Sequence, residues 1–241
     1  MLNEILFVVI LVVSNILQGL TGFGGAPLAM SGSIPLVGAD SAKAVVTFMF
    51  FIAPMFTALK NFKYINKKVF LIMIAFMAVG VVAGQFIYGI IPAKTLMIAY
   101  GAVVVLIGVI KFLVKTDKAL PKPWNYVALV FAGLMQGIIT SGGPFLVLYA
   151  TGELKDKNEF RATVSAIWAV LNTYIIITML IGGMYTAYEG TLAAIAVLPV
   201  IAAAIVSEKI VAKINVKVFL KIVYGLLILS GAVLIMNGLM Q

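Results

Sequence analysis

Long apolar stretches separated by short polar segments make up most of the chain. A helix needs about 20 apolar residues to span the hydrocarbon core of a bilayer, which is roughly 30 Å thick. Six unbroken stretches of about that length lie at about 42–59, 69–91, 95–114, 162–183, 190–206 and 218–236. The pattern therefore predicts an all-α, polytopic membrane protein.

Two further apolar regions, at about 4–39 and 124–152, are interrupted by glycine and proline. The first contains ILQGLTGFGGAPLAM over 16–30, and the second contains LMQGIITSGGPFLVL over 134–148. The two stretches align without a gap at an offset of 118 residues, the difference between 134 and 16. Alignment at a fixed offset indicates an internal duplication.

The duplication continues beyond the interruptions, because Lys43 falls on Arg161 at the same offset. The sequence therefore predicts two transmembrane repeats, residues 1–118 and 119–241, that together form one membrane domain. Each repeat contains one glycine-rich interrupted region and three spanning helices.

The distribution of basic residues indicates whether the two interrupted regions cross the membrane or enter it and turn back, since short cytoplasmic loops carry an excess of Lys and Arg. If both regions crossed, the 17 basic residues would divide eight against nine. If both turned back, Lys43 and Lys94 would lie on one side and the other fifteen of the 17 on the opposite side. The strong bias favours re-entrant helical hairpins. Three crossings per repeat then give inverted topology in the cell (inner) membrane, with both termini outside and the two hairpin tips meeting near the midplane.

The interruptions themselves are predicted to bind substrate. Non-helical backbone at membrane depth is tolerated where it is buried in protein or lines a wet cavity. Gly22, Gly24, Gly25, Gly142 and Gly143 are expected to allow positive φ and close backbone approach, and proline suits the first turn of the following half-helix. Such a helix N-terminus presents free N–H donors and a partial positive charge, which favour an anion. The predicted residues are Gln18, Gly19, Thr21, Gly22, Phe23, Gly24, Gly25 and Pro27 in the first repeat, and Gln136, Gly137, Thr140, Ser141, Gly142, Gly143 and Pro144 in the second.

Three polar residues on the helices that follow are further candidates. Lys43 and Arg161 place a cation near a helix N-terminus, where the helix dipole disfavours it, and a passing anion would explain both. Snorkelling, or pairing with Asp40 or Glu159 nearby in sequence, is the alternative explanation. Asn172, at mid-span, lines the pathway or bonds across helices.

For other residues, close helix packing is a sufficient explanation and no pathway is needed, because small residues commonly let helices approach each other in membranes. We expect Gly101, Gly108 and Gly225 to serve packing, and Trp168 as well.

Composition narrows the function classes. The chain is 63% hydrophobic and 10% charged, and its mean hydropathy of +1.18 leaves no room for a soluble domain. Cysteine and histidine are absent, which excludes disulfides, thiolate or imidazole metal sites and the corresponding nucleophiles, so we expect no enzyme, metal or cofactor. The basic residues that give the chain its net charge of +9 lie in short loops, so we expect membrane lipid rather than nucleic acid as a partner. All eight acidic residues lie in or near predicted loops or termini, which argues against a carboxylate proton relay.

The segments QGLTGFGGAPL and QGIITSGGPFL, each followed by a basic residue at the start of the next helix, resemble the sulfite exporter TauE/SafE family of small-anion permeases. The resemblance covers nearly the whole chain. It implies a permease for a small sulfur oxyanion or organosulfonate, such as sulfite, thiosulfate or sulfoacetate. Thr140 and Ser141 stand where the first motif has Gly22 and Phe23, so the two half-sites are unequal. An anion channel, a structural subunit of a membrane complex, and a homo-oligomer remain open.

Overall fold

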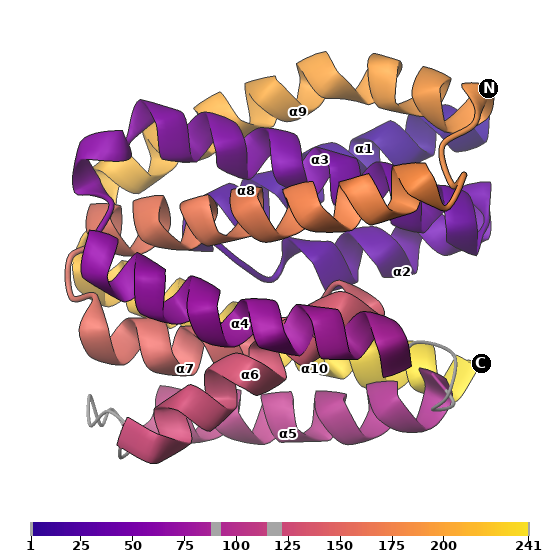
Figure 1. The fold of residues 1–241 in the computed structure, drawn as a ribbon. Coiled ribbons are helices and arrows are strands. Elements are labelled where there is room, and N and C mark those ends of the chain that lie inside the picture. The colour runs from indigo at the N-terminus through magenta and orange to yellow at the C-terminus, as the bar shows by residue number, and fades with distance from the viewer. Residues whose placement is uncertain (1, 88–92, 115–121, 241) are drawn as a thin grey trace. The chain divides into compact units, whose positions relative to one another are not determined.

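The computed structural model describes residues 2–87, 93–114 and 122–240. These residues form ten α-helices and one 3₁₀ turn (Figure 1). The helices are α1 (Leu2–Thr21), α2 (Gly25–Val37), α3 (Ala39–Lys60), α4 (Lys67–Ile87), α5 (Ala93–Val114), α6 (Lys122–Ile139), α7 (Gly143–Glu153), α8 (Lys157–Ile181), α9 (Ala187–Lys213) and α10 (Val216–Met240), and the 3₁₀ turn is η1 (Phe62–Tyr64). The all-α prediction is confirmed for the described residues.

The helices belong to two compact units, and each unit draws on both halves of the chain. Unit 1 comprises Met1–Phe70 and Arg161–Lys213, and unit 2 comprises Leu71–Phe160 and Ile214–Gln241. Unit 1 thus holds α1, α2, α3, α9 and nearly all of α8, while unit 2 holds α5, α6, α7, α10 and most of α4. Each unit contains one interrupted region. The division into repeats 1–118 and 119–241 stays a prediction from sequence similarity.

Within the described residues, six helices are long and apolar enough to cross a membrane, namely α1, α3, α4, α8, α9 and α10. Five of them correspond to predicted spans, and the predicted span 95–114 forms α5, whose apolar part is Ile98–Ile110. Residues 88–91 of the predicted span 69–91 lie outside the described residues. The chain is therefore a multi-pass membrane protein.

The interrupted regions each contain one short helix. The α2 and α7 helices have 13 and 11 residues. At a rise of 1.5 Å per residue they are only about 20 Å and about 17 Å long, too short to cross a hydrocarbon core of roughly 30 Å. The α1 helix has 20 residues and is long enough by itself. The re-entrant path of both regions and the inverted topology stay predictions.

Glycine lets neighbouring helices approach closely within unit 2. A Cβ at Gly80 of α4 would lie 2.1 Å from the Val130 carbonyl oxygen of α6, and a Cβ at Gly101 of α5 would lie 2.7 Å from the Gly231 carbonyl oxygen of α10. A Cβ at Gly108 of α5 would lie 2.8 Å from Ile228 Cγ1 of α10. The packing prediction is confirmed for Gly101 and Gly108.

The packing prediction is wrong for Gly225, because a Cβ there would meet no heavy atom within 4 Å.

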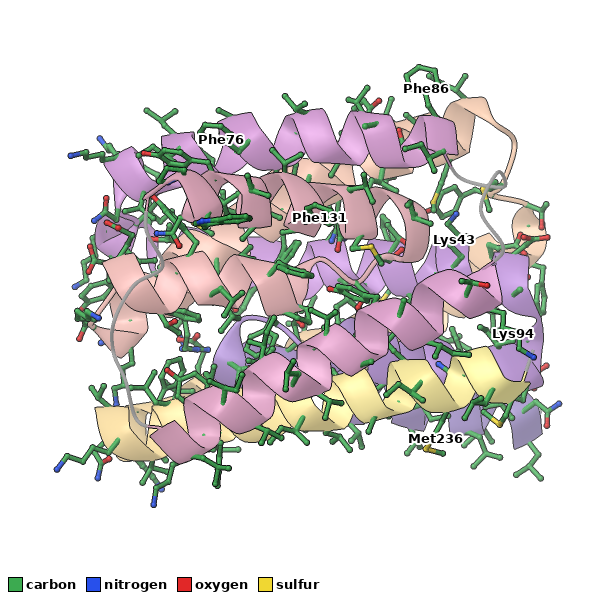
Figure 2. All side chains as sticks on the ribbon, turned by 90° about the horizontal axis from the view of Figure 1, so that it is seen from below. Lys43, Phe76, Phe86, Lys94, Phe131 and Met236 are labelled. Carbon is green, nitrogen blue, oxygen red and sulfur yellow. The ribbon has the colours of Figure 1, made fainter. Side chains whose placement is uncertain are left out.

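Many large apolar side chains project away from their own unit. Phe86 of α4 is 79% exposed and Met236 of α10 is 58% exposed (Figure 2). In a bilayer such side chains face lipid without penalty, because the lipid chains are as apolar as the side chains themselves.

Unit 1 has a core in which α1, α2, α3 and α9 meet. Phe7 and Leu11 of α1, Ala29 of α2, Phe50 of α3 and Val200 of α9 are all buried in this cluster. Figure 1 shows α1, α3 and α9 running side by side. This core includes Ala29 of α2 and so packs against the helix that follows the first break.

Candidate functional site

The first hairpin tip is the break between α1, which ends at Thr21, and α2, which begins at Gly25. Gly22 and Gly24 have φ values of 81° and 86°, in the left-handed region that glycine enters at little cost. The positive φ predicted for these two glycines is confirmed. Pro27 lies in the first turn of α2, as expected for a residue without an N–H donor.

Gln18 bridges the first tip. Its Oε1 accepts a hydrogen bond from the Gly25 N–H at 3.1 Å, and its Nε2 donates to the Gly22 carbonyl oxygen at 3.1 Å. The side chain is 6% exposed. An amide is well suited to this position because it has both an acceptor and donors for the backbone groups freed by the break. The structure therefore engages Gln18 in holding the tip together.

Gly25 and Gly19 are required for close approach. A Cβ at Gly25 would lie 2.2 Å from the Ser14 carbonyl oxygen, and a Cβ at Gly19 would lie 2.1 Å from the Ser207 Oγ. Gly25 begins a helix and is not among the positive-φ residues, so the positive φ expected there is wrong. Glycine is still needed at position 25 because a Cβ there would be too close to the Ser14 carbonyl oxygen.

Two more side chains fix the first tip. Trp168 of α8 donates from Nε1 to the Gly22 carbonyl oxygen at 2.6 Å, and Thr21 Oγ1 lies 2.7 Å from the Phe23 carbonyl oxygen. Phe23 is 1% exposed and packs as part of the buried tip. Trp168 is buried, as its packing role predicts, but it also holds the tip through an indole hydrogen bond. Sequence spacing could not indicate that bond, because Trp168 and Gly22 lie 146 residues apart.

The second hairpin tip is the break between α6, which ends at Ile139, and α7, which begins at Gly143. Gln136 Oε1 accepts a hydrogen bond from the Gly142 N–H at 3.1 Å, so at both breaks a glutamine oxygen binds a backbone N–H at the start of the following helix: that of the N-cap residue Gly142 here, and that of the first helical residue Gly25 at the first tip. Pro144 lies in the first turn of α7, as predicted. The two tips thus share a closing device as well as a sequence motif.

Glycine has a different role at the second tip than expected. Gly142 has φ −74° and Gly143 is helical, whereas the positive φ belongs to Thr140, at 53°. A Cβ at Gly142 would lie 2.2 Å from the Ala132 carbonyl oxygen, and one at Gly137 would lie 2.5 Å from the Val81 carbonyl oxygen. The positive φ expected at Gly142 and Gly143 is therefore wrong, and Gly142 and Gly137 serve close approach.

Ser141 brings a buried hydroxyl to the second tip. Its side chain is 2% exposed, and its Oγ has no hydrogen-bond partner among the residues that the structure describes. Its carbonyl oxygen accepts a hydrogen bond from the Tyr100 hydroxyl of α5. The Tyr100 ring also stacks on Phe145, with 5.7 Å between the ring centroids. The second tip is therefore held by Tyr100, while Ser141 Oγ stays without a hydrogen-bond partner among the described residues.

Asn172 and Lys43 lie on the helices that pack near the first tip. Asn172 Nδ2 of α8 donates to the Phe50 carbonyl oxygen of α3 at 2.7 Å, and the side chain is 1% exposed. The interhelical bond, one of the two alternatives for Asn172, is thus present. Lys43 is the fifth residue of α3 and is partly buried (Figure 2).

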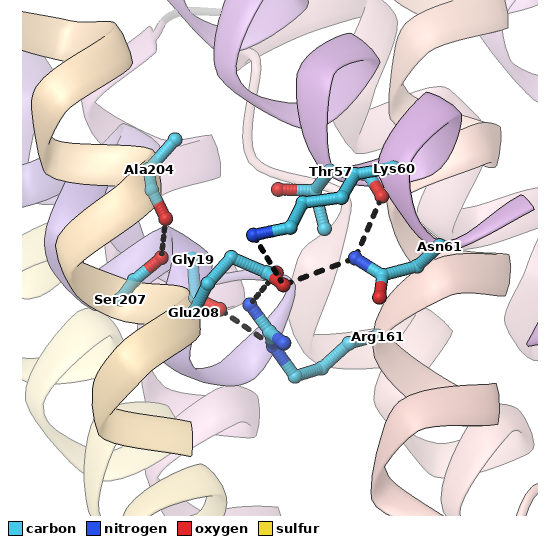
Figure 3. Close-up of polar contacts among 8 residues, drawn as sticks. All are labelled: Gly19, Thr57, Lys60, Asn61, Arg161, Ala204, Ser207 and Glu208. Atoms are coloured by element: carbon cyan, nitrogen blue, oxygen red, sulfur yellow. Dashed lines mark hydrogen bonds and ion pairs between the residues drawn. The ribbon is translucent and has the colours of Figure 1, made fainter. Parts of the chain in front are cut away.

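Arg161 does not pair with a neighbour in sequence. Its Nη2 lies 2.8 Å from Glu208 Oε1 of α9, and its Nε donates to the Gly19 carbonyl oxygen of α1 at 2.7 Å (Figure 3). The Arg161 side chain is only 4% exposed, so snorkelling is not its role. The guanidinium lies at the C-terminal end of α1, where the helix dipole favours a positive charge. Glu208 supplies the countercharge from a helix far along the chain.

Glu208 was missed as a site residue. It lies inside α9, five residues before Lys213, and its side chain is 11% exposed. Its Oε2 accepts a hydrogen bond from Asn61 Nδ2 at 3.2 Å and lies 3.8 Å from Lys60 Nζ (Figure 3). The sequence prediction counted this carboxylate as a residue near a loop. Its role depends on Lys60 and Asn61 at the end of α3 and on Arg161 of α8, which only the fold brings together around it.

Comparison with known proteins identifies a family for the chain. A family model described as Sulfite exporter TauE/SafE matches residues 6–234. No curated protein and no solved structure matches the chain. The match covers both hairpin tips and all the predicted site residues, so the resemblance indicated by the duplicated motif is confirmed.

Proposed function

We propose that this chain, which belongs to the sulfite exporter TauE/SafE family, carries a small sulfur oxyanion or organosulfonate across a membrane and recognises it at the hairpin tips. The family consists of membrane transporters of sulfur anions, so the chain is a multi-pass membrane transporter and not an enzyme. The choice of anion and the binding residues are the parts that we propose.

One observation carries the proposal of a binding site: the unpartnered hydroxyl of Ser141 at the N-terminus of α7. Buried polar atoms without a partner are rare in proteins and each needs an explanation. The N–H groups in the first turn of a helix also lack partners within that helix, and the helix dipole makes this end attractive to negative charge. A bound oxyanion would accept hydrogen bonds from the hydroxyl and from these N–H groups together.

The two tips differ in the donors that they leave for a substrate. At the first tip, Gln18 and Thr21 already hydrogen-bond to the backbone of the tip itself. At the second tip, Gln136 binds the Gly142 N–H, and Ser141 Oγ is left unsatisfied. We therefore propose that the second tip supplies the stronger contacts to the anion.

Uptake of labelled anions into vesicles tests this proposal. The purified chain is reconstituted, and thiosulfate, sulfite, sulfate and a sulfonate are compared. Ser141→Ala should raise the apparent KM for the transported anion by about 10-fold or more, since a hydrogen bond to a charged group contributes about 1.5–3 kcal/mol. Ser33→Ala is the matched control, because Ser33 Oγ is also buried with no hydrogen-bond partner in the described part of the chain but lies two turns into α2.

The outcomes of this experiment separate the alternatives. Flux that saturates with anion concentration identifies a carrier, and flux that rises linearly identifies a channel. An unchanged KM in Ser141→Ala would remove the second tip from the site. No flux of any of the four anions through folded protein would overturn the proposed function and favour a structural subunit.

A further inference from the structure

Exposed lysines gather at one end of unit 1, where α3 and α9 both finish. The two helices are joined there by the bond from Asn61 Nδ2 to Glu208 Oε2. Six exposed lysines lie in the last turns of these helices or in the segment that leads from α3 into α4. They are Lys60, Lys63, Lys67, Lys68, Lys209 and Lys213, and we call them the basic end.

The carboxylates of unit 1 lie mostly at the other end. Glu4, Asp40 and Glu189 are in the first turns of α1, α3 and α9. Only Glu208, among the described residues of unit 1, brings a carboxylate to the ends of α3 and α9. It already pairs with the buried Arg161, at 2.8 Å, and lies farther from Lys60, at 3.8 Å (Figure 3). The basic end therefore presents a strongly positive field to its surroundings.

Contacts through α8 hold the segment after α3 close to the end of α9. The Asn66 N–H donates to Thr163 Oγ1 of α8 at 3.0 Å. Two residues before Thr163, Arg161 binds Glu208 of α9. The lysines on either side of Asn66 and those on α9 thus belong to one end of unit 1.

Large apolar side chains are exposed beside these lysines. Leu59 is 68% exposed, Phe62 is 65% exposed and Tyr64 is 39% exposed. Lys63 Nζ lies 5.2 Å from the centroid of the Tyr64 ring. Lysines interleaved with exposed aromatic and aliphatic side chains are typical of segments that lie between lipid headgroups and acyl chains. The segment is therefore suited to a molecule that has both an anionic group and an apolar part.

Membrane orientation alone does not explain why acidic residues are missing from this segment. Residues 60–68 contain four lysines and no carboxylate, whereas residues 153–159, predicted to lie on the same side, contain three carboxylates and two lysines. Lys and Arg determine orientation, and Asp and Glu contribute little to it. A site for an anionic group does require that carboxylates be kept away, because like charges repel.

We propose that the basic end binds an anionic phospholipid of the leaflet that it faces. Its lysines contact the phosphate of the headgroup, and Leu59 and Phe62 contact the adjoining part of the acyl chains. The partner is a lipid rather than a free oxyanion, because exposed apolar side chains offer nothing to a small hydrophilic anion. The inference goes beyond the proposed function, since the lipid contacts neither hairpin tip.

Titration of the detergent-solubilised chain with dioctanoyl phosphatidylglycerol tests the inference, with dioctanoyl phosphatidylcholine as the zwitterionic comparison. Calorimetry gives the dissociation constant, and thermal unfolding gives the stabilisation. The anionic lipid should raise the Tm, because a ligand of the folded chain stabilises it by mass action, and phosphatidylcholine should not. Raised salt should weaken the binding, since exposed charges are screened.

Paired substitutions separate the basic end from net charge. Each lysine near an anionic lipid surface strengthens binding by about 5-fold, so Lys63→Gln together with Lys67→Gln should weaken binding by about 25-fold. The matched control is Lys155→Gln together with Lys217→Gln, which removes the same charge from exposed lysines of unit 2 and should leave the dissociation constant nearly unchanged. Phe62→Ala keeps all six lysines and should weaken binding by about 3-fold or more, because apolar contact with the acyl chains is lost.

Several results would overturn the inference. Equal weakening by the two lysine pairs would indicate a non-specific effect of net charge, and an unchanged affinity in Phe62→Ala would place the lipid elsewhere. Equal stabilisation by phosphatidylcholine would remove the role of the phosphate charge. Equal stabilisation by inorganic phosphate or sulfate at the same concentration would indicate a site for free anions. None of these results bears on anion transport through the hairpin tips, which vesicle uptake measures separately.

Discussion

Glycine meets two separate requirements at the hairpin tips. Gly22 and Gly24 adopt a left-handed backbone, whereas Gly25 has a helical one and is limited by the Ser14 carbonyl oxygen, only 2.2 Å from where a Cβ would lie. A single methyl group is therefore enough to disturb Gly25, although alanine is the best helix former. At Gly225 the same methyl group would meet nothing within 4 Å.

This contrast predicts the effect of two alanine substitutions. Gly25→Ala should abolish transport and lower the free energy of unfolding by about 1–3 kcal/mol, because α1 and α2 must move apart to admit the methyl group. Gly225→Ala should leave both unchanged or add slight stability, since alanine favours a helix more than glycine does. Uptake per folded molecule and thermal unfolding in detergent measure both effects. Normal uptake by Gly25→Ala would mean that the first tip tolerates a wider gap than the structure has.

At the scale of helices, α3 and α9 are tied together near both ends. Near the start, Ser41 Oγ donates to Glu189 Oε1 at 2.6 Å, and near the end Asn61 Nδ2 donates to Glu208 Oε2. The two pairs are separated by 148 and 147 residues in sequence, so the two helices run parallel with a constant register. Glu189 also accepts a hydrogen bond from the Thr186 N–H at 2.9 Å and thereby caps α9.

The loop before α9 adds a third contact to α3. Tyr185 donates its hydroxyl hydrogen to the Ala44 carbonyl oxygen at 3.0 Å. Burial raises the pKa of Tyr185 to about 12. The hydroxyl therefore stays protonated, and remains a donor, throughout the neutral range.

The tie near the start of α9 should affect stability without affecting transport chemistry. Glu189→Ala removes the cap and the bond to Ser41, and should lower the free energy of unfolding by about 1–2 kcal/mol. The affinity for anions should not change, because the bonds of Glu189, to Ser41 and Thr186, involve no residue proposed to bind the anion. Thermal unfolding and anion titration of the same preparations test this. A change in the affinity would show that the contact between α3 and α9 also affects the binding site.

The sequence was informative about elements and much less so about partners. The duplicated motif located both breaks within a few residues, and apolar length located the helices, because each signal is local. The partners in three bonds could not be foreseen: Gly22 for Trp168, Phe50 for Asn172 and Glu208 for Arg161. In each, two helices far apart in sequence supply the donor and the acceptor. Glu208 was dismissed for this reason, since position along the chain says nothing about the cations that surround it.

At the scale of the whole molecule, the basic residues predict how the chain lies in the membrane. Lys63 and Lys155 are exposed and belong to the fifteen residues assigned to one face. Because the chain has no cysteine, Lys63→Cys and Lys155→Cys each introduce a unique thiol. A membrane-impermeant thiol reagent should label both from the cytoplasmic side only, while tags at both termini should be reached from outside. Labelling of the two thiols from opposite faces would support crossing segments and would exclude the re-entrant arrangement.

The composition of unit 1 also affects the order in which the protein can mature. Its first three helices, α1 to α3, leave the ribosome early, but α8 and α9 are made only after α4 to α7. Until then Gly19 has no arginine at its carbonyl oxygen and Gly22 has no indole. Before α8 is made, the Gly22 carbonyl oxygen has the Gln18 amide as a donor, but the Gly19 carbonyl oxygen lacks the arginine that binds it in the complete unit, and an unpaired backbone group is costly in lipid. Completion of this unit is a late, post-insertion event, and the waiting hairpin is the stage at which membrane chaperones and quality-control proteases have most to recognise.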